Sequence, residues 1–236
     1  MQLEAALKAL TPSDSEVMFM GSMAHPGAGV GHGDAANDGF LRPNDPEGPS
    51  VLGVVVVTDE EDCSSFDTRH FTPDIFLDPS SELVMQGLNL RCHLNPDNLY
   101  PVSRYVDGLK RLREGNEDLV VFAVIAGVPT DLVDADARGA GDFSDPSARD
   151  AYYDGILADD RMQEVIEAGD PLLANLEPSC QTDNGRAFPP RRLVEAARGL
   201  GESGIVQSIC QDDFGPAFEI LIESLAARVE DLCMID

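Results

Sequence analysis

A run of β-branched residues constrains this chain more than any other feature. Residues Val51–Val57 read VLGVVVV, and the run stops at Thr58 before a block of acidic residues. A second apolar run covers Leu119–Pro129, and between the two runs apolar residues repeat at helical spacing over 102–115. Strand, helix and strand in this order predict a parallel βαβ unit, because parallel strands need a long crossover connection. We expect both strands to be buried on both faces of the sheet.

The rest of the chain extends this pattern. Helical spacing marks residues 2–10 and a helix from Pro190 to Gly199. A shorter strand covers Gly204–Cys210. Apolar residues from Phe218 to Val229 mark a last amphipathic helix, which has Pro216 in its first turn. The sequence therefore predicts an α/β fold with a doubly wound, mostly parallel sheet flanked by helices, of the Rossmann-like kind.

Two segments interrupt the pattern. Residues 21–50 are rich in Gly, Pro and Asp and predict a long irregular loop, while residues 130–188 predict a loop-rich excursion with one helix near 160–168. We expect a single domain over residues 1–236. The first helix begins at residue 2 with no capping residue before it, which favours a piece of a longer chain.

The charge excludes whole classes of partner. The chain carries 43 acidic and 16 basic side chains, a formal net charge of −27 with an isoelectric point near 4.2. Nucleic acids and anionic membrane surfaces would be repelled. No apolar run reaches the length that a membrane span needs, so no membrane span is expected in this chain.

The cysteines favour disulfides over a metal site. Five are present, Cys63, Cys92, Cys180, Cys210 and Cys233, and no CxxC pair occurs among them. Neighbourhood in the sequence favours the pairs Cys63–Cys92 and Cys180–Cys210, with Cys233 left unpaired; five buried thiols are the alternative. The histidines at 25, 70 and 93 show no partner at ligand spacing. Two disulfides predict an exported protein.

Acidic residues follow two of the predicted strands. Thr58, Asp59 and Asp62 come after the first strand, at the edge where open α/β sheets bind ligands. Hydroxyl and carboxylate oxygens suit Mg²⁺ or Ca²⁺, so these three residues are candidate metal ligands; solvated loop charges or helix caps are the alternative. For Asp212 and Asp213, after the third strand, helix capping is favoured. No sequence motif supports catalysis, so the chain is not expected to be an enzyme.

Read together, VVVVTDEEDCS, VVFAVIAGVP and the stretch from Gly204 to Val229 resemble the C-terminal two-thirds of a von Willebrand factor A-type domain. More narrowly, residues 1–232 are similar to the cysteine-containing A-like domains of exported bacterial proteins and lipoproteins. The resemblance implies a metal-ion-dependent adhesion site, in which Asp59 matches the aspartate of a hydrophobic-Thr-Asp-Gly pattern and Glu60 replaces the glycine. The family's DxSxS motif is absent, and its first strand would precede Met1.

The expected function is a noncatalytic binding or adhesion module of a bacterial surface protein, extracellular, periplasmic or surface-anchored. It would bind a protein or cell-surface ligand with a divalent cation, Mg²⁺ or Ca²⁺, near Asp59. A Mg²⁺-dependent hydrolase of phosphatase-like type, using Asp59 and Asp62, is one alternative. A purely structural surface domain is the other.

Overall fold

The structure is a computed structural model of the chain. It describes residues 1–20, 29–35, 37–42, 44, 50–134, 143–169, 174–183 and 185–233, with only the backbone for 231–233. The described parts of the 21–50 loop hold turns and one isolated bridge, between Phe19 and Gly29.

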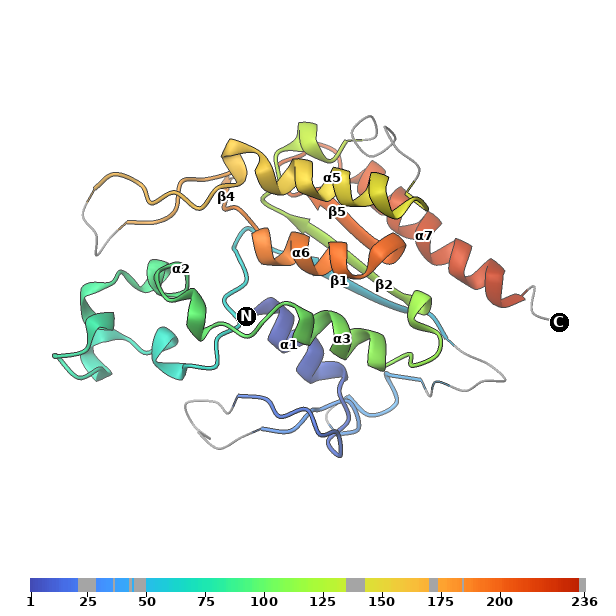
Figure 1. The fold of residues 1–236 in the computed structure, drawn as a ribbon, viewed down its shortest axis with the longest axis horizontal. Helices are drawn as coiled ribbons and strands as arrows, with labels where there is room; N and C mark the ends of the chain where they lie inside the picture. Colours follow the sequence, from blue (N-terminus) through green and yellow to red (C-terminus); the bar gives the residue numbers. More distant parts are fainter. Residues whose placement is uncertain are drawn as a thin grey trace.

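A three-stranded parallel sheet forms the centre of the molecule (Figure 1). Its strands lie in the order β1 (Leu52–Val57), β2 (Val120–Ala126) and β5 (Gly204–Ser208). In the register, Val54 pairs with Phe122 and Val124 pairs with Val206. The α/β class and the three parallel strands predicted from the sequence are confirmed. The carboxyl ends of all three strands meet at one edge of the sheet.

Helices cover both faces of the central strand. One face packs against α1 (Gln2–Leu10), α3 (Ser103–Arg111) and α6 (Arg191–Gly199), with α5 (Pro146–Ala158) beside α6; the other packs against α7 (Gly215–Cys233). Successive side chains of β2 alternate between these faces. Phe122 and Val124 join the cluster that contains Leu7 and Leu193, whereas Val121 packs with α7. Every residue of β2 is buried for this reason.

The first strand differs from the prediction of burial on both faces. In β1, Leu52, Val54 and Val56 are buried, but Val55 is 43% exposed and Val57 is 62% exposed. The reason is the course of α7, which packs mainly on β2 and β5 and reaches β1 at Gly53, through Leu225, before Val55 and Val57. Only the face of β1 that turns toward α1 and α3 is fully covered.

The predicted helix near 160–168 is wrong. The helix of this region is α5, which starts earlier, at Pro146, with the side chain of Asp145 accepting a hydrogen bond from the Ser147 N–H. Residues 160–162 form only a 3-10 turn, and the chain around Ile166 runs antiparallel to the chain around Leu176. A short antiparallel pair, β3 (Cys180–Thr182) with β4 (Gly185–Ala187), completes this excursion.

Residues 68–94 form a lobe beside the sheet, the teal region of Figure 1, built from 3-10 turns and the short helix α2 (Arg91–Leu94). The guanidinium of Arg91 is fully buried in it. Nη1 donates to the carbonyl of Thr72 at 2.6 Å, Nε donates to the carbonyl of Leu83 at 3.2 Å, and Nη2 pairs with Asp74. Arg91 thus supplies donors to backbone carbonyls of the lobe that no strand pairing or long helix satisfies.

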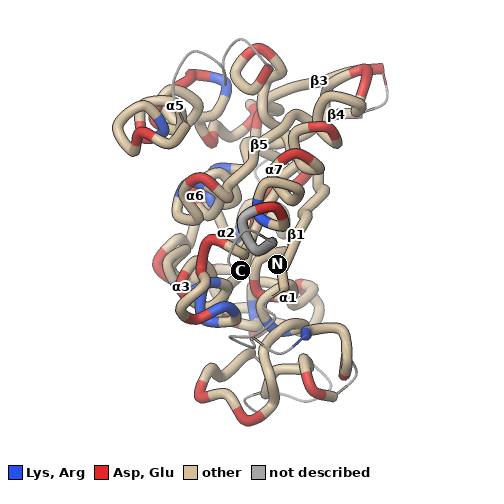
Figure 2. The backbone as a smooth tube through the Cα atoms, turned by 90° about the vertical axis from the view of Figure 1, so that its right-hand side faces the viewer, with Lys and Arg blue, Asp and Glu red and all other residues tan. Residues whose placement is uncertain are grey.

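Acidic residues are spread along the whole chain in Figure 2, on the helices as well as on the lobes, and basic residues are fewer. Among the described residues, no helix has both the length and the apolar character needed to cross a membrane.

Candidate binding cleft at the carboxyl end of β1

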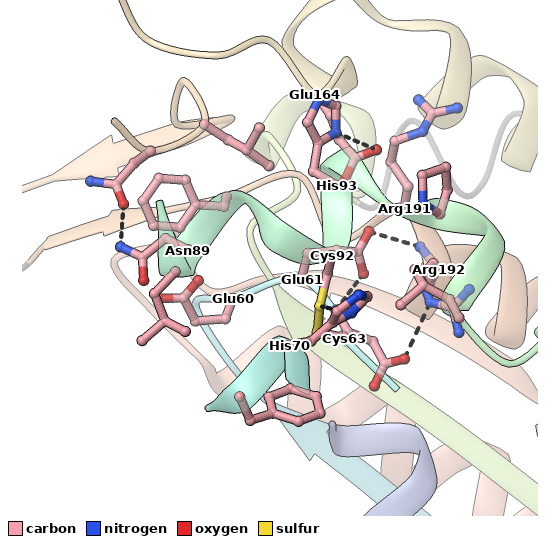
Figure 3. Close-up of a pocket in the computed structure, with 18 of the residues that line it drawn as sticks. Glu60, Glu61, Cys63, His70, Asn89, Cys92, His93, Glu164, Arg191 and Arg192 are labelled. Carbon is pink, nitrogen blue, oxygen red and sulfur yellow. Dashed lines mark hydrogen bonds and ion pairs between the residues drawn. A yellow bond between two sulfur atoms is a disulfide. The ribbon is translucent and has the colours of Figure 1, made fainter. Parts of the chain in front are cut away.

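A cleft of about 460 Å³ opens beside the loop that follows β1 (Figure 3). Its walls come from segments that are far apart in the sequence: residues 60–63, the lobe at 70–71 and 88–93, Pro96 and Leu99, Glu164, residues 175–176, Phe188, and the start of α6. The topology explains the position, because the carboxyl ends of parallel strands leave a crevice where open α/β folds bind ligands.

The loop after β1 is held by its own polar groups. The Thr58 hydroxyl accepts hydrogen bonds from Gln2 Nε2 at 2.9 Å and from the Glu60 N–H at 3.1 Å. The Asp59 carbonyl accepts one from the Phe188 N–H at 2.9 Å. The side chains of Asp59 and Glu60 are exposed.

The carboxylate of Asp62 is held inside the protein by contacts with other residues. Its side chain is fully buried, and its oxygens accept hydrogen bonds from the Leu3 N–H at 3.0 Å and from the Ser64 hydroxyl at 2.7 Å. Arg192 Nε lies 3.3 Å from the second oxygen. Of the three residues predicted to hold a divalent cation, only Asp59 presents a carboxylate to solvent, while Thr58 faces α1. Metal binding at Asp59 stays a prediction.

Glu61 lies in the cleft wall and is half-buried. One carboxyl oxygen accepts a hydrogen bond from the Asp62 N–H, and the other accepts one from the Arg192 N–H at 3.0 Å, in the first turn of α6. These donors favour the ionised carboxylate, but burial outweighs them and raises the pKa of Glu61 to about 8. No sequence signal marks this position, since Glu61 is one of four consecutive acidic residues, Asp59 to Asp62.

The basic side chains of the cleft are already engaged. Arg191 donates to the carbonyls of Leu157 and Met162. Arg192 donates to the carbonyl of Tyr100 in addition to Asp62. The cleft also holds four glutamates: Glu60, Glu61, Glu164 and Glu195. Because its raised pKa leaves Glu61 largely protonated at neutral pH, the other three carboxylates make the charge that the cleft offers to a ligand negative.

Two contacts join the walls across the cleft (Figure 3). Asn89 Nδ2 donates to Asn175 Oδ1 at 2.6 Å, and His93 Nδ1 lies 3.6 Å from Glu164 Oε2. Each contact connects the lobe to the opposite wall, at Asn175 or at Glu164.

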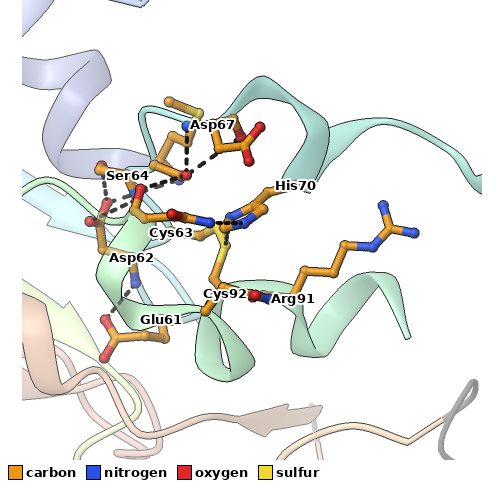
Figure 4. Close-up of a disulfide and its surroundings, with 12 residues drawn as sticks. Glu61, Asp62, Cys63, Ser64, Asp67, His70, Arg91 and Cys92 are labelled. Carbon is orange, nitrogen blue, oxygen red and sulfur yellow. Dashed lines mark hydrogen bonds and ion pairs between the residues drawn. A yellow bond between two sulfur atoms is a disulfide. The ribbon is translucent and has the colours of Figure 1, made fainter. Parts of the chain in front are cut away.

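The disulfide Cys63–Cys92 lines the cleft and ties the loop after β1 to α2 (Figure 4). His70 is buried beside it, with Nδ1 3.8 Å from Cys92 Sγ and Nε2 3.3 Å from Asn98 Nδ2. Burial lowers the pKa of His70. The expectation that His70 has no partner is therefore wrong. Spacing in the sequence misses the contact because the fold and the disulfide bring the residues together.

The second disulfide, Cys180–Cys210, joins β3 to the residues after β5. Both pairs favoured by the sequence are thus joined in the structure. The side chain of Cys233 lies outside the described residues. Asp213 accepts a hydrogen bond from the Gly215 N–H at the start of α7, as the capping interpretation of this residue expects.

Comparisons of the chain with protein-family models, with curated proteins and with solved structures find no match.

Proposed function

We propose that the chain is a noncatalytic binding module of an exported bacterial surface protein, of the von Willebrand factor A-like kind, and that its cleft receives a cationic segment of a partner protein. The observation that carries the proposal is the set of three carboxylates around the cleft, at Glu60, Glu164 and Glu195, in a cleft whose arginines are already engaged. The parallel sheet flanked by helices and the two disulfides support the fold family and the exported setting.

Charge favours a cationic ligand. Glu60 and Glu195 are exposed at the cleft, on the loop after β1 and on α6, where each can pair with a lysine or arginine of a partner. The net charge of −27 attracts such a partner over longer distances and raises its association rate at low salt.

Large apolar side chains also line the cleft. They are those of Phe71, Leu88, Leu99, Leu176 and Phe188. A ligand that combines a basic group with an apolar body would bury that body here, and burial of apolar area supplies most of the affinity of small sites. A short peptide segment with a basic residue next to an aliphatic or aromatic one has this chemistry.

The test is selection of displayed random heptapeptides on the immobilised, oxidised chain, followed by calorimetry of the enriched peptides. We expect enrichment of Lys or Arg beside an apolar residue, with affinity that falls as salt rises. The double variant Glu60→Gln/Glu195→Gln should lose most of the binding.

The matched control is Glu219→Gln/Glu223→Gln, which makes the same charge change on α7, on the other face of the sheet. It should bind the peptides like the unaltered chain. Enrichment of acidic or purely apolar peptides, or equal loss of binding in both double variants, would contradict the proposal.

A divalent cation beside Asp59 is a second proposal for the same edge of the sheet. It is supported by the exposure of Asp59 and by its proximity to Glu60, whose pKa is raised by burial and by the charge of Asp59. If Mg²⁺ or Ca²⁺ binds there, a millimolar concentration should raise the melting temperature relative to EDTA, and Asp59→Ala should abolish the rise. An equal rise in Asp59→Ala would place the cation elsewhere.

A further inference from the structure

The cysteine pair in the cleft has a neighbour that the second pair lacks. Within the described chain, one group of cysteine, histidine and acidic side chains has the geometry to hold a metal ion, namely Cys63, His70 and Cys92. We propose that reduction of the Cys63–Cys92 disulfide creates a binding site for a zinc-like metal ion, with both thiolates and the His70 imidazole as ligands. This site is independent of the proposed peptide ligand.

The distances suit this chemistry. The three ligand atoms lie within 4.8 Å of one another, and His70 Nδ1 is 3.8 Å from Cys92 Sγ. Zinc bonds of about 2.3 Å to sulfur and about 2.0 Å to nitrogen place the ligand atoms of a tetrahedral site roughly 3.5–3.8 Å apart. Once the sulfur–sulfur bond is broken, the two sulfurs need only separate to that spacing, while the imidazole already stands near it.

The surroundings would support the ligands. Asn98 Nδ2 lies 3.3 Å from Nε2 of His70, the ring nitrogen other than the one nearest Cys92. A half-turn of this amide presents Oδ1 as an acceptor for the Nε2–H, and such a partner fixes the orientation of a ligating imidazole. His70 is buried, whereas Cys63 and Cys92 are half-buried and line the cleft. A metal ion and a reductant can therefore reach the sulfurs, and the fourth coordination position faces the cleft, where water can occupy it.

The reaction balances with a dithiol as reductant. The dithiol is oxidised to its own disulfide, the Cys63–Cys92 bond is reduced, and each cysteine gains one proton. A zinc ion then displaces both thiol protons to solvent and accepts a lone pair from each thiolate and from Nδ1 of the neutral His70 ring, which carries its proton on Nε2 and donates it to Asn98 Oδ1 once that amide has turned. Two thiolates cancel the charge of the ion. Thiolate ligands select zinc over Mg²⁺ and Ca²⁺, which separates this site from the one proposed at Asp59.

The test uses the full chain carrying Cys233→Ser, so that this cysteine cannot contribute. The protein is reduced with a phosphine, which is oxidised to its phosphine oxide with oxygen from water, and is then titrated with Co²⁺ under nitrogen. We expect one equivalent of Co²⁺ to give the charge-transfer absorption of thiolate ligation, and Zn²⁺ to displace it. The oxidised chain should give none.

Variants assign the ligands. Cys63→Ser and Cys92→Ser should each remove the absorption. His70→Asn should weaken binding by more than about tenfold, since loss of even an outer-shell partner costs that much. The matched control, Cys180→Ser/Cys210→Ser, removes the other pair and should bind Co²⁺ unchanged. Absorption that survives in both Cys63→Ser and Cys92→Ser would overturn the proposal.

Alkylation of the reduced chain gives a readout that does not depend on how the variants fold. One equivalent of Zn²⁺ should slow the reaction of iodoacetamide with Cys63 and Cys92 but not with Cys180 and Cys210, as resolved by mass spectrometry. Equal rates at all four cysteines with and without Zn²⁺ would overturn the proposal, because a chain that cannot hold its ligands in place after reduction has no such site.

Discussion

The carboxylate of Asp62 lies 3.3 Å from Nε of Arg192 and joins the loop after β1 to the first turn of α6. The same carboxylate accepts the N–H of Leu3 at the start of α1. One buried anion thus connects three elements that meet at the carboxyl end of β1, and the cleft depends on their positions.

Replacement of this anion should destabilise the fold. In Asp62→Ala, the Leu3 N–H and the Ser64 hydroxyl lose their acceptor, and Arg192 keeps a largely buried charge without its partner. We expect a loss of about 3–5 kcal/mol in the free energy of unfolding, the usual cost of breaking a buried ion pair on one side. Urea denaturation followed by circular dichroism measures it. Asp59→Ala is the control and should change the free energy by less than about 0.5 kcal/mol.

The free energy of unfolding should decrease as the pH rises, because Glu61 ionises. Burial raises the pKa of this carboxyl in the folded state to about 8, above its ordinary value of 4.5. The folded chain therefore binds the proton more tightly than the unfolded chain, so the stabilising contribution is complete below pH 4.5 and is lost as the pH rises toward 8.

Glu61→Gln isolates this effect. The amide does not titrate, so the free energy of unfolding of the variant should decline less between pH 5 and pH 8 than that of the unaltered chain. Parallel urea titrations across this range measure the difference, with Glu195→Gln as a control at an exposed position. Identical pH profiles for Glu61→Gln and the unaltered chain would show that Glu61 ionises normally.

Gly127 and Gly155 should respond in opposite directions to the same substitution. A Cβ at Gly127, just past β2, would collide with the carbonyl of Phe188 and with Ala187, whereas a Cβ at Gly155 in α5 meets no described atom within 4 Å. Gly127→Ala should cost about 1–3 kcal/mol. Gly155→Ala should stabilise the chain by up to about 1 kcal/mol, because alanine favours helix. Thermal melts of the two variants decide this, and a stable Gly127→Ala would mean that the β4–α6 connection can shift.

The disulfide Cys180–Cys210 should stabilise the fold without any role in metal binding. It closes a loop with a sequence separation of 30 residues. In the chain-entropy model such a closure contributes roughly 3–4 kcal/mol, so Cys180→Ser/Cys210→Ser should lower the free energy of unfolding by about that amount. Guanidinium denaturation of the oxidised proteins measures it; a loss below about 1 kcal/mol would mean that the unfolded chain is compact without the bond.

The sheet could be predicted from the sequence because its strands are marked locally. The apolar runs at Val51–Val57 and Leu119–Pro129, with a helical pattern between them, leave little alternative to a parallel unit. The exposure of Val55 and Val57 could not be predicted in the same way, because it depends on where α7 crosses the sheet. A β-branched run indicates a strand but does not say what covers each face.

The position of the candidate site could be predicted from the sequence, but its side-chain contacts could not. The carboxyl end of β1 was identified from the acidic residues that follow the strand, and the cleft lies there. Asp62 is buried against α1, burial beside α6 raises the pKa of Glu61, and His70 lies against Cys92 of α2. Such contacts join residues that are distant in the sequence, and one chain read alone has no local pattern for them.

The burial of Arg91 has a consequence for how the lobe moves. Its guanidinium satisfies the carbonyls of Thr72 and Leu83 and pairs with Asp74, so these interactions are lost together when the side chain leaves its site. We expect the amide hydrogens of residues 68–90 to exchange with deuterium in one cooperative opening rather than residue by residue. The lobe is thus expected to unfold locally as a single unit. Because Cys92 follows Arg91 directly in α2, each opening also exposes the half-buried disulfide more fully to solvent.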